Sequence, residues 1–130
     1  MPSYAVYRVT ETGLPRNHHA IFVETEEDGP GSGCRFNVTG NVQNGMEYEE
    51  RKTGKPQESA SFMGMEKLGV VDPGSYSRLQ SICRSTPVPK KQFDGPKRLY
   101  PDVPLRRCQE WTAETVKRLI DEQALEISVS

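Results

Sequence analysis

The strongest structural signal in the chain is the run His18-His19-Ala20-Ile21-Phe22-Val23-Glu24. Its β-branched and aromatic residues favour a strand. The acidic, glycine-rich residues 25–33 turn the chain, and residues 34–39 then read as the return strand of a hairpin. Because side chains alternate between the two faces of a strand, His18 and His19 point to opposite faces. Only one of the two histidines can therefore face a given site.

A second signal lies near the C-terminus. From Cys108 onward, apolar residues recur at helical spacing with charged residues between them, which predicts an amphipathic helix. The apolar stripe consists of Trp111, Val116, Leu119, Ile120 and Leu125. We expect this stripe to pack on the sheet. The expected fold class is α+β, with an antiparallel sheet built from the first half and a C-terminal helix that carries the cysteine.

The remaining segments are less uniform. Residues 4–9 and 46–51 read as further strands, and residues 76–83 carry apolar side chains at helical spacing. Residues 62–71 fit neither period cleanly, because two glycines interrupt them. Residues 89–104 form a proline- and lysine-bearing segment that is too long for a simple connector, and we expect it to lie as a loop over the site.

The bulk properties favour one domain over residues 1–130. With 17 basic and 18 acidic residues the net charge is −1, so no global field attracts nucleic acid. No apolar run approaches the roughly 20 residues that span a bilayer, and the N-terminus lacks the pattern of a signal peptide. The three cysteines have no metal-ligand spacing, which fits a reducing cytoplasm. We therefore expect a cytoplasmic protein with no nucleic-acid partner, no membrane span and no metal.

Three residues indicate a catalytic site with a cysteine nucleophile. Cys108 lies at the start of the helix, where unpaired N–H groups and a partial positive charge favour a thiolate. His18 is the matching base, and the amide of Asn37 on the return strand can hold the imidazole in one tautomer. Each residue also has a plain structural interpretation: a buried cysteine, an exposed strand-edge histidine and a turn asparagine. A strand register flipped by one residue exchanges His19 for His18.

The order of a histidine strand, a polar strand and then a cysteine helix resembles the circularly permuted papain-like superfamily. That superfamily includes the lecithin:retinol acyltransferase-like proteins and the PPPDE-type isopeptidases. His18-His19-Ala20-Ile21-Phe22 is similar to the histidine strand of the acyltransferase-like branch, and Asn37 stands where a second polar residue, often histidine, is usual. Arg107-Cys108-Gln109-Glu110-Trp111 corresponds to the nucleophile motif. The chain also resembles an uncharacterised group of small fungal proteins with a His-x-Ala-x-Phe-Val strand and a Cys-Gln-x-Trp helix.

The resemblance implies a papain-like cysteine hydrolase or acyltransferase that acts on an ester, thioester or amide bond. Cys108 would be the nucleophile, His18 the base and Asn37 the orienting group, without a cofactor. The Cys108 backbone N–H is the expected oxyanion donor, while a second donor, the substrate (small molecule or peptide) and the oligomeric state stay open. The alternatives are a non-catalytic binding module on the same fold and a small-molecule acyl-transfer or cyclisation enzyme of secondary metabolism.

Overall fold

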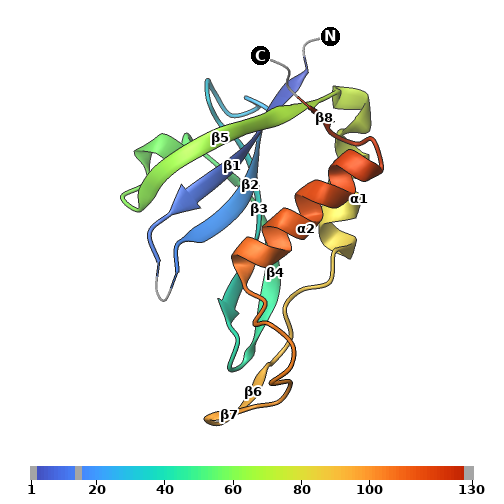
Figure 1. Ribbon diagram of the computed structural model, residues 1–130. Coiled ribbons are helices and arrows are strands. Elements are labelled where there is room, and N and C mark those ends of the chain that lie inside the picture. Colours follow the sequence, from blue (N-terminus) through green and yellow to red (C-terminus); the bar gives the residue numbers. More distant parts are fainter. Residues whose placement is uncertain (1–2, 14–15, 128–130) are drawn as a thin grey trace.

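The computed structural model of the chain describes residues 3–13 and 16–127. Its main element is a six-stranded antiparallel sheet with the order β4-β3-β2-β1-β5-β8 (Figure 1). The strands are β1 (Tyr4–Glu11), β2 (His18–Glu24), β3 (Gly33–Asn41), β4 (Gly45–Thr53), β5 (Phe62–Val71) and β8 (Glu126–Ile127). The expected hairpin of β2 and β3 is confirmed by an antiparallel pairing with Ile21 opposite Phe36 and Val23 opposite Cys34.

Two helices, α1 (Tyr76–Ser85) and α2 (Cys108–Asp121), pack together against the sheet (Figure 1). Short 3₁₀ turns lie at Pro56–Glu58 and Pro73–Ser75. Trp111 of α2 is fully buried, and its indole N–H donates to the Thr86 carbonyl at 3.2 Å. The face of α2 that carries Trp111 and Leu119 therefore belongs to the main core, as its periodicity predicts. Ile120 of the expected stripe is instead exposed, and Leu125 is buried but lies beyond the end of the helix. The fold is α+β, with a C-terminal helix that carries the cysteine.

Strand β2 is buried on both faces. Ile21 and Val23 lie in the core under the helices, while Ala20 and Phe22 are buried on the opposite face. That second face is approached by the segment 51–59, which lines a cavity together with Phe22. Burial on both sides explains why β2 is a continuous apolar run and does not alternate between apolar and polar residues.

The ambiguous residues 62–71 form the long strand β5, which pairs with β1. The register shifts between Val6 and Tyr7 and again between Thr10 and Glu11. Each shift breaks the two-residue alternation, so no single period fits the sequence. Gly69 lies where β8 pairs with β5. There is no room for a side chain at this position, because a Cβ would lie 2.1 Å from the Glu126 carbonyl oxygen.

The segment between the helices contains a small hairpin that the sequence analysis did not predict. Strands β6 (Phe93–Asp94) and β7 (Lys97–Arg98) pair with each other and project beyond the tip of the β3–β4 hairpin (Figure 1). The backbone is fixed to that tip by the Met46 N–H donating to the Pro89 carbonyl and the Gln92 N–H donating to the Val42 carbonyl. Within residues 3–13 and 16–127, no helix has the length and apolar character that crossing a bilayer requires.

Candidate active site

Cys108 and His18 lie together at one end of the sheet. Cys108 is the first residue of α2, and His18 is the first residue of β2. Their side chains approach with Cys108 Sγ 3.5 Å from His18 Nδ1. Ninety residues of chain separate the two. A thiol at a helix N-terminus next to an imidazole is the arrangement that can pass a proton from sulfur to nitrogen.

The residues next to this pair tie the start of β2 to the start of α2. The Gln109 side-chain amide donates to the Asn17 carbonyl at 2.9 Å. Arg16 Nη2 donates to Glu110 Oε1 at 2.5 Å, and the same carboxylate oxygen accepts the Arg107 backbone N–H at 2.6 Å. The two residues before His18 are thus bonded to the two residues after Cys108. This double clamp fixes the separation of sulfur and imidazole.

The His18 ring also rests on a glycine. A Cβ at Gly13 would lie 2.4 Å from His18 Cδ2 and Nε2, far inside van der Waals contact. Gly13 does not have a positive φ. A glycine is needed at this position because it leaves space for the His18 ring, not because of its backbone conformation. The loop before β2 therefore supports the imidazole from the side opposite to the edge that contacts Cys108.

His19 has a different environment. It pairs with Thr10 on β1, and its carbonyl oxygen accepts a 3.4 Å hydrogen bond from the Thr112 hydroxyl of α2. Burial, helped by the charges of Arg8 and Arg16, lowers the pKa of the His19 side chain. The imidazole that contacts the Cys108 sulfur is that of His18, the member of the pair assigned as base from the sequence.

Asn37 is not bonded to His18 in this structure. Its buried side-chain oxygen accepts a 3.4 Å hydrogen bond from Arg35 Nε. The paired residues of β2 and β3 end at Ile21 and Phe36, so Asn37 lies just beyond the paired section. The expected contact between Asn37 and the imidazole across the β2–β3 hairpin is therefore not formed.

Glu11, which the sequence analysis missed, is the residue opposite His18 on β1. Its carboxylate forms an ion pair with Arg35 and accepts a 3.4 Å hydrogen bond from the Ser61 hydroxyl. Burial favours the neutral carboxyl, but the Arg35 guanidinium, the Ser61 hydroxyl and the charge of His18 outweigh it and lower the pKa of Glu11. Glu11 can be identified as a neighbour of His18 only from the register of β1 against β2.

A cavity of about 100 Å³ opens at the Cys108–His18 pair. Its lining combines both residues with Arg16 and Arg107 and with residues 40–43 of the β3–β4 turn. A cavity of this size admits a carbonyl group and its substituent to the thiol, and a longer substrate extends out of it.

The other two cysteines have no comparable setting. Burial raises the pKa of the Cys34 thiol, and burial raises the pKa of the Cys83 thiol to about 12. Neither residue lines the cavity. Within the part of the chain that the structure describes, no three His, Cys, Asp or Glu side chains are grouped so as to hold a metal ion.

The structure therefore defines an α+β protein in which a helix-terminal cysteine and a strand-terminal histidine share a small, arginine-lined cavity. The chain belongs to DUF6540, a family of unknown function, which it matches over residues 6–126. The matched span includes both residues of the pair. Comparisons with curated proteins and with solved structures give no match.

Proposed function

We propose that this protein is a papain-like cysteine hydrolase or acyltransferase acting on an ester, thioester or amide bond. The observation that carries the proposal is the 3.5 Å approach of Cys108 Sγ to His18 Nδ1 in a shared cavity. The order of histidine strand and cysteine helix along the chain matches the permuted papain-like arrangement. A structural cysteine has no need of an imidazole, a helix terminus and a cavity together.

In the proposed reaction, His18 Nδ1 accepts the thiol proton as Cys108 Sγ attacks the carbonyl carbon. The carbonyl oxygen becomes an oxyanion, which the backbone N–H of Cys108 stabilises. Collapse of this intermediate breaks the bond to the leaving alcohol, thiol or amine, and His18 returns the proton to it. Water or another nucleophile then attacks the acyl group on Cys108 and releases the free thiol.

Two residues are candidates for the third member of the site, the group that orients His18. Asn37 is the residue expected from the sequence, but its side-chain oxygen accepts from Arg35. Glu11 is paired with His18 across the β1–β2 ladder, and its carboxylate is charged, so it can stabilise a protonated imidazole. We assign Glu11 as the positioning residue that acts through His18, with Arg35 joining it to Asn37.

The test is formation of an acyl-enzyme from p-nitrophenyl acetate. We expect a rapid release of p-nitrophenolate and a 42 Da mass increase on Cys108 (roughly one acetyl group for one proton) in the intact protein. Cys108→Ala should abolish both, and His18→Ala should slow both by at least about 10²-fold. His19→Ala is the matched control and should leave both unchanged. Equal acetylation of all three cysteines, or no effect of His18→Ala, would contradict the proposal.

The alternative is a non-catalytic binding module on the same fold. It is favoured by the small volume of the cavity and by the exposed surface of the segment between the helices. In that case Cys108 would show no acylation above that of an ordinary free thiol.

A further inference from the structure

The segment 87–107, here called the basic arm, joins α1 to α2 and contains the β6–β7 hairpin. It holds six of the 17 basic residues of the chain but only two of its 18 acidic residues. The chain as a whole has a net charge of −1. The basic arm is therefore a local region of positive charge on a slightly acidic protein. The six residues are Lys90, Lys91, Lys97, Arg98, Arg106 and Arg107.

Most of this charge has no carboxylate partner. Among the ion pairs of residues 3–13 and 16–127, only Arg106 of the six takes part, with Glu114 of α2. Lys90, Lys91 and Lys97 are exposed. Exposed cations that no acidic side chain neutralises attract an anionic partner at moderate ionic strength.

The basic arm also contains an apolar groove of about 230 Å³. Tyr100 and Val103, which line this groove, are each 58% exposed. The groove is concave and large enough for one leucine- or phenylalanine-sized side chain. Its apolar lining consists of Val88, Pro89, Tyr100, Val103, Pro104 and Leu105.

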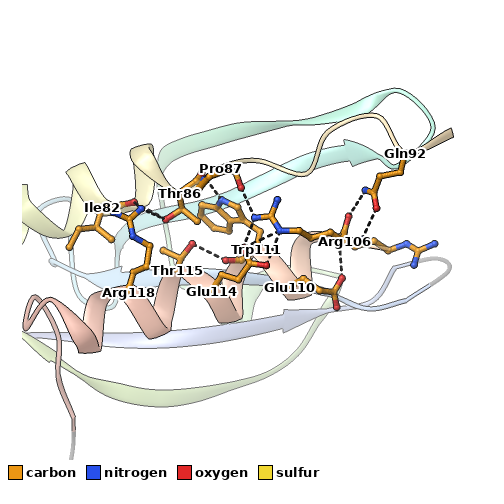
Figure 2. Close-up of polar contacts among 11 residues, drawn as sticks. Ile82, Thr86, Pro87, Gln92, Arg106, Glu110, Trp111, Glu114, Thr115 and Arg118 are labelled. Atoms are coloured by element: carbon orange, nitrogen blue, oxygen red, sulfur yellow. Dashed lines mark hydrogen bonds and ion pairs between the residues drawn. The ribbon is translucent and has the colours of Figure 1, made fainter. Parts of the chain in front are cut away.

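The groove has a fixed base. The Gln92 side chain accepts from the Arg106 N–H and donates to the Arg106 carbonyl, both at 2.8 Å. The Arg106 guanidinium in turn bonds the Pro87 carbonyl and the Glu114 carboxylate, as Figure 2 shows. Arg98 Nη2 donates to the Val103 carbonyl at 2.5 Å. A surface that is ordered before binding loses less entropy when a partner docks.

The groove is next to the candidate active site. It ends at Leu105 and Arg106, and the following residue, Arg107, already lines the cavity at Cys108. Since each residue spans at most about 3.6 Å of extended chain, the three steps from Leu105 to Cys108 place their Cα atoms within roughly 11 Å of each other. An extended peptide of about four residues is long enough to span this distance.

We propose that the basic arm docks an acidic polypeptide segment through one apolar anchor side chain in this groove, and that the docked segment presents the bond that Cys108 attacks. This inference rests on the proposed function and narrows its substrate class to acidic peptides or proteins. The concave groove fits a single side chain, whereas insertion into a bilayer calls for apolar side chains that protrude. The positive charge thus favours an anionic partner, and the concave shape of the groove favours a peptide over a bilayer.

The test uses two fluorescein-labelled octapeptides with the same central leucine, flanked by glutamates in one and by lysines in the other. Their binding to the full-length Cys108→Ala protein is measured by fluorescence anisotropy. We expect the glutamate peptide to bind at least about tenfold more tightly, with an affinity that falls as salt rises. Lys90→Glu/Lys91→Glu/Lys97→Glu should abolish this preference, and Val103→Ser/Leu105→Ser should weaken binding of the glutamate peptide about tenfold.

A matched control reverses three exposed cations outside the basic arm, in Lys55→Glu/Lys67→Glu/Arg78→Glu, and should leave the preference unchanged. Equal binding of both peptides, or an equal loss in the control, would overturn the docking proposal. So would arm-dependent sedimentation with phosphatidylserine vesicles in the absence of peptide binding. Because Cys108→Ala has no nucleophile, peptide docking on the arm is supported even if acylation of the wild-type protein fails, and only the catalytic assignment is then lost.

Discussion

Two of the cysteines lie on helices, and their surroundings differ in nearly every respect except burial. Cys83 lies inside α1 with no exposed surface, and its burial raises the pKa of the thiol to about 12. Cys108 is only 5% exposed, but it begins α2 and faces an imidazole and a cavity. Burial alone therefore says little about the role of a cysteine. Its position on the helix and its nearest polar neighbour separate a core residue from a candidate nucleophile.

The largest expected effect is the difference between removing one cysteine and removing the other. Cys108→Ala should lower turnover of p-nitrophenyl acetate by at least about 10³-fold, since no other group can form the acyl-enzyme. Cys83→Ala should retain turnover but lower the free energy of unfolding by about 1 kcal/mol, because it leaves a gap in the core. Initial rates and urea denaturation measure the two quantities. Loss of turnover in a folded Cys83→Ala protein would contradict the assignment of Cys83 as a core residue and Cys108 as the nucleophile.

The next effect concerns the position of His18. Gly13→Ala places a methyl group where the His18 ring lies, so the ring must leave its present position against Cys108. A displacement of about 1 Å can cost about 10²-fold in rate, and acylation should fall by that order. Gly64→Ala is the matched control, because a Cβ at Gly64 meets no other atom. Equal acylation rates in the two variants would show that the imidazole is not used.

A smaller effect is expected at the clamp. Gln109→Ala removes the hydrogen bond to the Asn17 carbonyl, which is worth about 1 kcal/mol and hence roughly fivefold in rate if the His18 position depends on it. Gln109→Ala should therefore slow acylation in addition to lowering the free energy of unfolding by about that amount. Gln80→Ala, which removes a distant bond to Glu50, serves as the control. A purely structural clamp would instead shift stability alone.

The smallest effect is a change of stability with pH. Burial favours the neutral Glu110 carboxyl, but hydrogen bonds from Arg16 and from the Arg107 N–H outweigh it, so the pKa of Glu110 lies below its ordinary value. A carboxylate whose pKa is lowered in the folded state stabilises the fold at a pH above its ordinary pKa of about 4.5. That stabilisation is lost as the pH falls through the lowered pKa. Wild-type protein should lose more stability than Glu110→Gln between pH 5 and pH 3 (approximate limits). Parallel pH profiles of the unfolding midpoint would contradict this.

Much of the fold was accessible from the sequence. The strand at 18–24, its return strand and the helix from Cys108 carry strong local patterns, and all three are confirmed. Strand β5 was ambiguous because two register shifts against β1 break its alternation. The β6–β7 hairpin consists of two-residue strands, which are too short to leave a periodic signal.

The site was predictable in part, for a related reason. Cys108 and His18 each begin an element with a clear local pattern, and the resemblance to permuted papain-like proteins implied that they meet. Asn37 and Glu11 depend on strand register instead. The β2–β3 pairing stops before Asn37, while the β1–β2 pairing continues to Glu11 and His18. Register is set by contacts between strands, which the sequence of a single strand does not contain.

The most direct test of the central assignment is the pH dependence of iodoacetamide labelling at each cysteine, read by mass spectrometry in wild type, His18→Ala and His19→Ala. We predict that Cys108 labels faster than Cys34 and Cys83, and that only His18→Ala removes this advantage. If Cys108 labels no faster than the other two, or keeps its advantage without His18, the cysteine–histidine pair is not a catalytic unit.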